Sequence, residues 1–230
     1  DKYPSIADLE KLARRRIPYF AWEYLDSGTG MEECLQRNLD AFRQISLVPK
    51  QMMGELTPDI STKLFGTKYA APFGVAPVGL SSLMWPKAEN ILAKTAADYN
   101  FPYTLSTVAN RTPEEIGAIT KDMGWFQLYP PRDPELRRDL LARAKDSGFK
   151  VLLVTSDVPV SSRRERQKRA GITIPPKITL KTLYRSAVHP RWSLETLAAG
   201  QPRFRTLEKY ADASQMQKVA EFIGQNLGGS

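Results

Sequence analysis

The chain has very little of the chemistry that metal centres and disulfides require. Its 230 residues include one cysteine, Cys34, and one histidine, His189. A single cysteine excludes an internal disulfide, and the lack of a cysteine–histidine cluster nearly excludes a zinc site. Cys34 falls in a helix-like stretch from Met31 to Phe42. We expect it to be a half-buried structural thiol.

The sequence also lacks a long apolar run. No uninterrupted run approaches the roughly 20 residues that a membrane span needs. The first residues, Asp1 to Arg16, are charged and helical, without the apolar core of a signal peptide. With 42% hydrophobic and 25% charged residues, the composition is ordinary for a soluble globular protein. We therefore expect a cytoplasmic protein.

Charge of one sign is in excess, because the formal net charge is +8. Part of this charge lies between Arg163 and Arg169, where five of seven residues are basic and Glu165 is the acidic exception. Such a cluster can bind a polyanion. No aromatic residue is interleaved with these cations, so nucleic-acid binding is the weakest hypothesis. A solvated basic loop explains most of them, including Arg163 and Arg166.

A regular alternation of short apolar runs and helical stretches begins at residue 73. The apolar runs are Phe73–Pro77, Tyr103–Ser106, Trp125–Tyr129 and Val151–Thr155. Residues 86–99, 113–121 and 134–147 between them are helical in pattern, and Thr112 and Asp133 are good N-caps for two of these helices. Short apolar strands that alternate with helices predict parallel βα units.

Parallel βα units form either an open doubly wound sheet or a closed barrel. No Gly-x-Gly-x-x-Gly turn follows any of the runs, which disfavours the open dinucleotide-binding sheet. Polar residues gather at the strand ends instead, with Gln127 and Tyr129 on one face and Thr155 and Asp157 on one face. This pattern is typical of a barrel mouth, where active sites lie. The predicted fold is α/β, a (βα)8 TIM barrel.

Only about four of the eight barrel units can be found. We predict an N-terminal helical segment and lead-in (1–72), barrel units one to four (73–170), and a long loop with a following helix (171–230). Four parallel strands curved as part of a barrel would leave unpaired edges. We therefore expect the C-terminal half of the barrel to exist as a second chain or as sequence removed from this one.

Six short motifs, in order along the chain, resemble the FMN-dependent 2-hydroxy-acid dehydrogenase and oxidase family. This family includes glycolate oxidase, mandelate dehydrogenase and flavin-dependent lactate dehydrogenases. The motifs are Tyr24 before Asp26-Ser27-Gly28, Ala76 to Leu80, Leu105 to Thr107, Trp125 to Tyr129, Thr155 to Pro159 and Arg163 to Arg166. The stretch from Pro77 to Pro86 is closer to the bacterial dehydrogenases than to the plant oxidases.

The resemblance implies a role for each matching position. The backbone of Pro77, Val78 and Gly79 would lie along the flavin ring, and Ser106, Gln127 and Thr155 would hydrogen-bond its polar edge. The substrate carboxylate and hydroxyl would be held by Tyr24, Tyr129 and Arg164. Asp157 would orient and charge the catalytic histidine, so that Tyr129 and Asp157 are the catalytic residues in this chain.

The residue types suit that chemistry. A flat cofactor needs close backbone approach, hence Gly79, and its carbonyls and ring nitrogens need neutral donors and acceptors. An arginine fork such as Arg164 matches a carboxylate. Each residue also has a plainer interpretation. Tyr24 is then a core aromatic, Arg164 a solvated cation and Asp157 a helix cap, while Ser106 and Thr155 are ordinary strand-end hydrogen bonders.

The sequence departs from the family pattern after residue 170. A lysine on strand 5, a His-Gly-Gly-Arg-like turn after strand 7 and a phosphate site near strands 7 and 8 cannot be matched in residues 171–230. His189 is a poor candidate for the base. The expected function is oxidation of an L-2-hydroxy acid to the 2-oxo acid with FMN. The base must then come from the C-terminal half, and this chain alone is predicted to be inactive. The alternative is a non-catalytic half-barrel that serves as a binding or scaffold fragment.

Two partner surfaces are expected besides the small hydroxy-acid substrate. The family implies a homo-oligomer, often a tetramer. Residues 171–202 mix apolar and cationic side chains, and the corresponding loop docks on lipid in membrane-bound relatives. The chain would then sit at the inner face of the membrane. Alternatively, the loop covers the active site or a neighbouring subunit.

Overall fold

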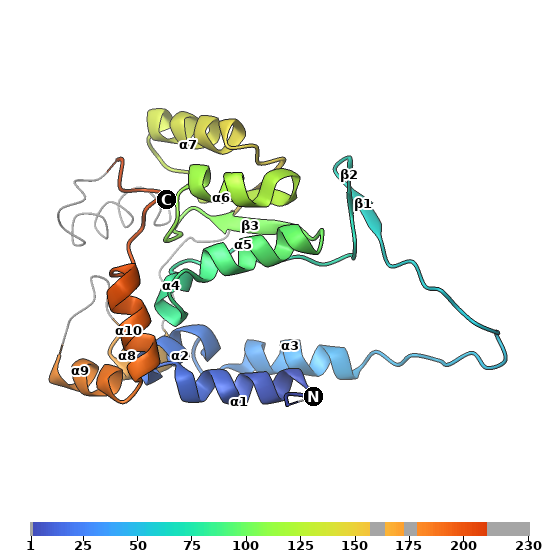
Figure 1. Cartoon of the computed structure of the whole chain (residues 1–230), viewed down its shortest axis with the longest axis horizontal. Helices are drawn as coiled ribbons and strands as arrows, with labels where there is room; N and C mark the ends of the chain where they lie inside the picture. The colour runs from blue at the N-terminus through green and yellow to red at the C-terminus, as the bar shows by residue number, and fades with distance from the viewer. Residues whose placement is uncertain (1, 157–163, 173–178, 211–230) are drawn as a thin grey trace.

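A computed structural model describes residues 2–156, 164–172 and 179–210 of the chain (Figure 1). The N-terminal helices are α1 (Ile6–Arg16), α2 (Tyr19–Asp26) and α3 (Glu33–Arg43), followed by strands β1 (Thr62–Leu64) and β2 (Thr67–Tyr69). The central part contains α4 (Ser81–Met84), α5 (Ala88–Asp98), β3 (Tyr103–Ser106), α6 (Pro113–Thr120), the 3-10 helix η1 (Lys121–Met123), β4 (Gly124–Leu128), α7 (Pro134–Asp146) and β5 (Val151–Val154). The last elements are α8 (Glu165–Ala170), α9 (Leu180–Ala187) and α10 (Pro190–Ala199).

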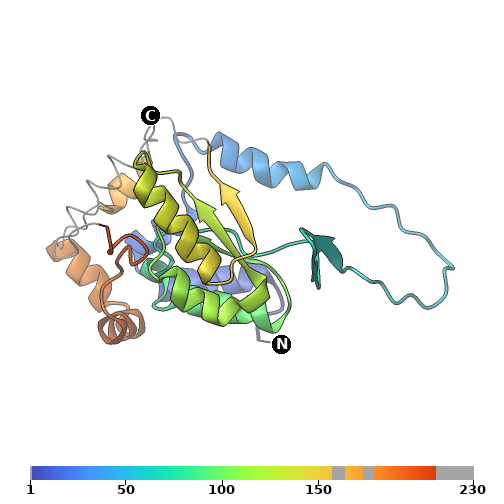
Figure 2. The same ribbon diagram turned by 90° about the horizontal axis from the view of Figure 1, so that it is seen from above.

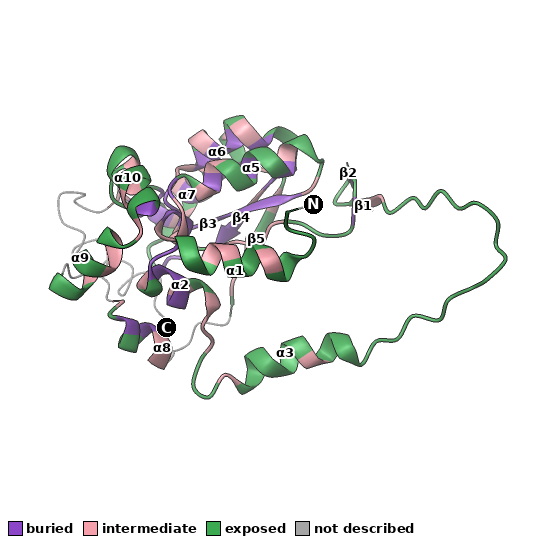
Figure 3. Cartoon of the chain, turned by 60° about the horizontal axis from the view of Figure 1, so that its bottom comes forward, coloured by how far each residue is buried: buried purple, intermediate pink, exposed green. Residues whose placement is uncertain are grey.

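Strands β3, β4 and β5 form a parallel sheet in that order. Ser106 pairs with Gln127, and Gln127 with Leu153. Each strand is connected to the next through a helix, as βα units require. The spatial order of the strands follows the order along the chain, as in a barrel (Figure 3).

The first predicted barrel strand, Phe73–Pro77, does not form a strand. It lies beside β3 and makes one parallel bridge, between Val75 and Tyr103. The Val75 N–H donates to the carbonyl of Pro102 at 2.8 Å, and the Val75 carbonyl accepts from the Thr104 N–H at 3.0 Å. Pro77 has no N–H and cannot extend the ladder at the next equivalent position, so the run stays too short to count as a strand.

One face of the sheet is covered by helices α5, α6 and α7 (Figure 2). Alternate residues point to opposite faces of a strand, so Phe126 and Leu128 of β4 pack on the helices and Gln127 points to the other face. The core on the helical side includes Ala93, Leu105, Ile116, Phe126, Leu136, Leu140 and Phe204. In a closed barrel the face that carries Gln127 is the interior.

The helix starts predicted at Thr112 and Asp133 are confirmed. The Thr112 hydroxyl accepts from the Glu115 N–H, and the Glu115 carboxylate accepts from the Thr112 N–H, which completes a capping box. The Asp133 carboxylate accepts from the Glu135 N–H at 2.8 Å. Both caps place a helix directly after the loop that leaves a strand end.

A short antiparallel hairpin, β1–β2, lies in the lead-in that precedes the barrel units. Contacts with β4 anchor it. The Trp125 indole N–H donates to the Tyr69 hydroxyl at 2.8 Å, and Phe65 meets the Trp125 ring edge-on. These partners lie more than 50 residues apart in the chain, so no local pattern reveals the contact.

Helix α3 and residues 44–60 run away from the rest of the molecule, and apart from the half-buried Asp40 they are exposed (Figure 3). The expected half-buried state of Cys34 is wrong, because its side chain is exposed. Leu35, Leu39 and Phe42 share a side of this helix and are also exposed. The sequence carries the apolar stripe of a packed helix, but none of the described residues covers it.

Residues 171–202, which were expected to form a loop, contain helices α9 and α10. Helix α8 packs on α2, and α9 contacts α10. Asp157, Arg163 and the helix predicted at the end of residues 171–230 lie outside the described residues. The boundaries proposed at residues 72 and 170 remain predictions.

Candidate active site

The ends of the three parallel strands are joined by a row of hydrogen bonds on the inner face of the sheet. The Ser106 hydroxyl donates to Gln127 Oε1 at 3.2 Å, and Gln127 Nε2 donates to Thr155 Oγ1 at 2.8 Å. Ser106 and Gln127 are buried and Thr155 is partly exposed. Because strands β3, β4 and β5 are in parallel register, their polar ends meet in one line. We call Ser106, Gln127 and Thr155 the polar row.

Thr107, which the sequence analysis did not single out, fixes the middle of the row. Its N–H donates to Gln127 Oε1 at 3.2 Å, and its hydroxyl donates to the Gln127 carbonyl at 2.6 Å. The same hydroxyl accepts from the Tyr129 N–H at 3.1 Å. Thr107 is fully buried. It therefore holds Gln127 and Tyr129 in place through hydrogen bonds within the protein.

Residues Pro77 to Gly79 lie on one side of this mouth. Val78 is 39% exposed, which is high for an aliphatic side chain, and Pro77 is half-buried. The conformation of the loop is held by a hydrogen bond from the Ser81 hydroxyl to the Val78 carbonyl and by one from the Leu80 N–H to the Val108 carbonyl. An exposed apolar backbone turn of this kind offers a surface for a flat ring.

Gly79 is required for a reason that the sequence analysis missed. A Cβ at this position would come within 2.7 Å of Val108 Cγ2. Real Cβ atoms do not approach other atoms so closely, so any larger residue would displace the loop or the valine. The close packing of the loop on residue 108 already explains the glycine.

Tyr24 of α2 joins the N-terminal helices to the mouth. Its hydroxyl donates to the Gly79 carbonyl at 3.0 Å. Burial raises the pKa of this hydroxyl, the positive charge of Arg164 lowers it, and Tyr129 raises it further. The pKa of Tyr24 thus responds to both Arg164 and Tyr129. The core-aromatic interpretation of Tyr24 is incomplete, because its polar end reaches the site.

Arg164 is the N-cap residue of α8 and is exposed. The helix itself is tied to α2 by the next residues. Arg166 contacts Glu23, Asp26 and Glu32, so the interpretation of Arg166 as a solvated cation is wrong. The sequence gives no local signal for this, because the three carboxylates lie more than 130 residues away.

Two other predicted positions are less informative. Asp157 lies outside the described residues. His189 stands at the start of α10, where its Nδ1 contacts the Arg185 carbonyl at 2.7 Å. This is a local contact between two helix ends. Among the described residues no cluster of three or more metal-ligating side chains occurs.

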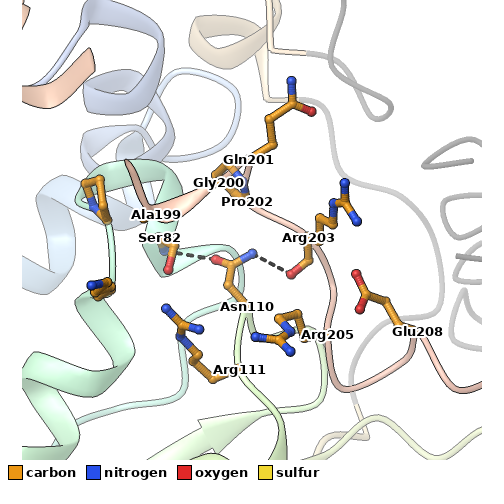
Figure 4. A pocket seen from close by; sticks show the side chains of 12 residues that line it. Ser82, Asn110, Arg111, Ala199, Gly200, Gln201, Pro202, Arg203, Arg205 and Glu208 are labelled. Carbon is orange, nitrogen blue, oxygen red and sulfur yellow. Dashed lines mark hydrogen bonds between the residues drawn. The ribbon is translucent and has the colours of Figure 1, made fainter. Parts of the chain in front are cut away.

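A separate cavity of about 280 Å³ lies where the segment after α10 meets α4 and the loop after β3 (Figure 4). Its wall is built on Asn110, which accepts from the Ser82 N–H at 2.9 Å and donates to the Arg203 carbonyl at 2.8 Å. None of the site residues predicted from the sequence lines this cavity. The hydrogen bonds of Asn110 hold residues 199–208 against the barrel portion.

The residues at the mouth fit an isoalloxazine ring. The polar row presents neutral hydroxyl and amide groups, which can donate or accept as the carbonyls and nitrogens of the ring require. Val78 supplies an exposed apolar surface beside the row. The row carries no charged side chain, which suits a cofactor edge that is itself neutral.

Comparison with known proteins gives the same family as the motifs. The model of the FMN-dependent dehydrogenase family matches residues 13–228. An L-lactate dehydrogenase of Caulobacter vibrioides is 36% identical over 198 residues, which are 86% of this chain and 51% of that protein. The 4-hydroxymandelate oxidase of Amycolatopsis orientalis is 38% identical over 179 residues, 77% of this chain and 49% of that protein.

Solved structures agree. The crystal structure of the monotopic membrane protein (S)-mandelate dehydrogenase superposes with a TM-score of 0.90 at 27% identity, covering 97% of this chain and 60% of that one. A mandelate oxidase structure has a TM-score of 0.71 at 34% identity, covering 83% and 55%. The chain spans about half the length of the curated relatives it matches. It is a TIM-barrel portion, and it belongs to the FMN-dependent dehydrogenase family, whose cofactor is FMN.

Proposed function

We propose that this chain supplies the N-terminal half of an enzyme that oxidises an L-2-hydroxy acid to the 2-oxo acid with FMN. The observation that carries the proposal is the polar row, a line of neutral hydrogen-bonding groups at the barrel mouth, with Tyr24 and Tyr129 beside it. When bound, FMN supplies the electron acceptor for the substrate carbon. The row would hold the edge of the ring through hydrogen bonds that need no charge.

In this proposal the substrate carboxylate is bound by the Arg164 guanidinium, whose planar fork can donate two parallel hydrogen bonds. The hydroxyls of Tyr24 and Tyr129 orient the substrate. Tyr24 would exchange its hydrogen bond to the Gly79 carbonyl for one to the substrate. His189 is bound locally to the Arg185 carbonyl, so the histidine base would come from the other half of the barrel. Asp157 would orient that histidine.

The test uses the complemented protein, defined as this chain joined to, or co-expressed with, the C-terminal half of the barrel. The complemented protein should purify yellow. Its flavin absorbance, at about 450 nm as for oxidised flavins in general, should bleach when L-lactate or (S)-mandelate is added anaerobically. The 230-residue chain alone should show no turnover. A complemented protein that takes up no FMN would contradict the proposal and would favour the non-catalytic scaffold.

A matched pair of variants separates the polar row from its surroundings. Gln127→Leu removes two hydrogen bonds of the row and should reduce FMN binding by about tenfold or more, since a hydrogen bond left unmade at a buried site costs about 1–3 kcal/mol. Thr95→Val, which removes a hydroxyl bonded to a helix carbonyl on α5, is the control and should leave FMN binding unchanged. FMN fluorescence quenching measures both.

A second candidate function, attachment to a membrane surface, is favoured by the orientation of α9. Leu180, Leu183 and Tyr184 are 86%, 55% and 70% exposed, whereas Arg185 turns inward. The Arg185 guanidinium lies over the Tyr19 ring at 4.5 Å and donates to the Ala170 carbonyl. The helix thus presents its apolar side outward, the reverse of a helix that covers a core.

Helix α10, which contacts α9, also exposes two leucines, Leu194 and Leu197, at 67% and 79%. Its anchor is Trp192, which is buried and donates to the carbonyls of Leu83 and Met84. No helix in the described part of the chain is long and apolar enough to cross a bilayer. The proposed attachment is therefore interfacial, with α9 and α10 lying in the headgroup region.

Flotation with phosphatidylcholine–phosphatidylglycerol vesicles tests this. The chain should float with the vesicles, and the double variant Leu183→Glu/Tyr184→Glu should remain in the soluble fraction. Ile6→Glu, at an 80% exposed position on α1, is the control and should float normally. If all three remain soluble while light scattering gives an oligomer that the double variant loses, the surface binds a neighbouring subunit.

A further inference from the structure

Arg166 is the centre of an ion-pair cluster that joins two distant parts of the chain. Its Nε and Nη2 donate to the two carboxylate oxygens of Glu23 at 2.6 and 3.0 Å, in the two-point geometry of a guanidinium–carboxylate pair. Nη2 also donates to Asp26 at 2.7 Å. Nη1 donates to both oxygens of Glu32 at 3.0 and 3.2 Å. One side chain of α8 thus holds α2 and the turn before α3.

The central ion pair of the cluster, Arg166 with Glu23, is largely buried. The Glu23 side chain is 5% exposed and that of Arg166 is 28% exposed. A buried carboxylate is stable only when it is paired and hydrogen-bonded, and loss of its partner leaves an uncompensated charge. A lysine in place of Arg166 would keep the charge but could not form the forked contacts to three carboxylates.

The residues around Arg166 tie α8 to the same part of α2. Gln167 is buried and its Nε2 donates to the Tyr24 carbonyl at 3.4 Å. Glu165 accepts from the Gly30 N–H at 3.1 Å. We call Arg166 with Glu23, Asp26 and Glu32 the clamp. The clamp residues are therefore interleaved in sequence with the proposed substrate residues. Tyr24 follows Glu23, and Arg164 precedes Arg166 by two positions.

We propose that Arg166 is a positioning residue, which sets the spacing between Tyr24 and Arg164 at the substrate site. This inference rests on the proposed function, because it concerns the same hydroxy-acid site. Arg166 itself touches neither flavin nor substrate in this scheme. It fixes the two helices that carry the substrate-binding side chains, so that the carboxylate of the substrate meets both at once.

Arg166 also balances charge at this place. The acidic groups around it are Glu23 and Asp26 on α2, Glu32 before α3 and Glu165 on α8. Among the described residues, the other cations of this region are Arg164, Lys168 and Arg169. Removal of Arg166 would take away one positive charge beside a site for an anionic substrate. Repulsion of the substrate carboxylate would then add to the loss of position.

The test compares variants of the complemented protein. Arg166→Gln should raise the KM for the 2-hydroxy acid and lower kcat/KM by about 10- to 100-fold, the size expected when reacting groups are misplaced by about 1 Å. FMN affinity should stay unchanged, because Arg166 has no contact with the polar row. Arg166→Lys should recover only a small part of kcat/KM, since it restores charge without the fork.

Two controls separate position from simple loss of charge or stability. Arg169→Gln removes the same charge from the exposed side of the same helix and should change kcat/KM by less than about threefold. Arg143→Gln breaks a comparable ion pair with Glu114, between α6 and α7, and should lower stability with little effect on KM. Glu23→Gln in the Arg166→Gln background should lower KM again, because it removes the unpaired buried carboxylate.

Hydrogen exchange provides a readout besides activity. Arg166→Gln should increase amide exchange in residues 19–26 and 165–170 and leave β3 and β4 protected. If exchange rises but KM does not change beyond that of Arg143→Gln, Arg166 is only structural and the positioning role is wrong. Unchanged exchange contradicts the clamp itself. If the unsubstituted complemented protein binds no FMN or oxidises no 2-hydroxy acid, the proposed function fails, while the exchange result still decides whether the clamp exists.

Discussion

The two edges of the parallel sheet differ in how much of their apolar surface this chain covers. We call the edge at β3 the covered side and the edge at β5 the open side. On β3, Leu105 is fully buried beneath α5 and α6, and all four residues of the strand are buried. On β5, Leu152 and Val154 lie on the equivalent face by register, yet they are 44% and 57% exposed. β5 (Val-Leu-Leu-Val) is more apolar than β3 (Tyr-Thr-Leu-Ser), so the difference in burial comes from the surroundings of the strands and not from their residue types.

The comparison extends to the helices. Leu140 of α7 is fully buried, whereas α3 buries none of its residues although its apolar stripe is regular. Because the chain spans about half the length of its relatives, we propose that the covered side is complete here and the open side meets the other half of the barrel. An apolar pattern thus predicts that a surface becomes buried, but it does not identify the segment that buries it.

The largest expected effect separates the two sides directly. Leu140→Ala should destabilise the chain by about 2–5 kcal/mol, because it opens a cavity in the core. Leu152→Ala should cost less than about 0.5 kcal/mol, since the side chain is already in contact with water. Urea unfolding followed by circular dichroism measures both.

Complementation sharpens this first prediction. In the complemented protein Leu152→Ala should become costly, approaching the range of Leu140→Ala. An equal and small cost of Leu152→Ala with and without the other half would show that the open side is an exposed surface in its own right.

The next effect concerns the helix–helix contact on the covered side. A Cβ on Gly117 of α6 would lie 2.1 Å from the Ser147 carbonyl oxygen, so Gly117→Ala should force α6 and α7 apart at a cost of about 1–3 kcal/mol. A Cβ on Gly28, in the turn before the exposed helix α3, would lie 3.3 Å from Leu35 Cβ. Gly28→Ala should be close to neutral, as judged by thermal unfolding midpoints.

A smaller effect is expected at the helix caps. Thr112→Ala removes the capping box of α6 and should cost about 1 kcal/mol. Ser5→Ala removes the cap of α1, a helix with no buried residue, and should cost less, because the first turn of that helix can fray without loss of packing. Equal losses would contradict the view that packing on the covered side amplifies a cap.

The smallest effect is a pH dependence. The hydrogen bond from Arg143 holds the pKa of Glu114 at about 2 against an ordinary value of 4.5. A depressed carboxyl pKa stabilises the folded state above the unfolded value, and this contribution is lost as the pH falls from 4.5 toward about 2. Glu114→Gln should flatten part of the stability–pH profile in that window. The effect should be small, because the Glu114 side chain is 53% exposed.

Much of the barrel portion could be predicted from local pattern. The runs at Tyr103, Trp125 and Val151 became strands because short apolar segments between helices have few other ways to satisfy their backbone. Thr112 and Asp133 capped their helices because capping depends on residues three or fewer positions away. The line of Ser106, Gln127 and Thr155 follows from parallel register.

The rest depended on contacts between distant residues. The hairpin β1–β2 forms against Trp125, and the exposure of Cys34 reflects the absence of a described neighbour. The run at Phe73 failed to become a strand because Pro77 interrupts its ladder. The pairing of Arg166 with Glu23 joins residues 143 positions apart, which no window along the chain contains.

By itself, the sequence determined the βα order, the helix caps and the family, because these depend on residue type and on neighbours a few positions away. The tertiary structure alone decided which apolar faces are covered, why Gly79 must be glycine, and how α8 is pinned to α2. Burial and ion pairing are properties of surroundings, and the surroundings of a residue are set by chain segments that its own sequence does not identify.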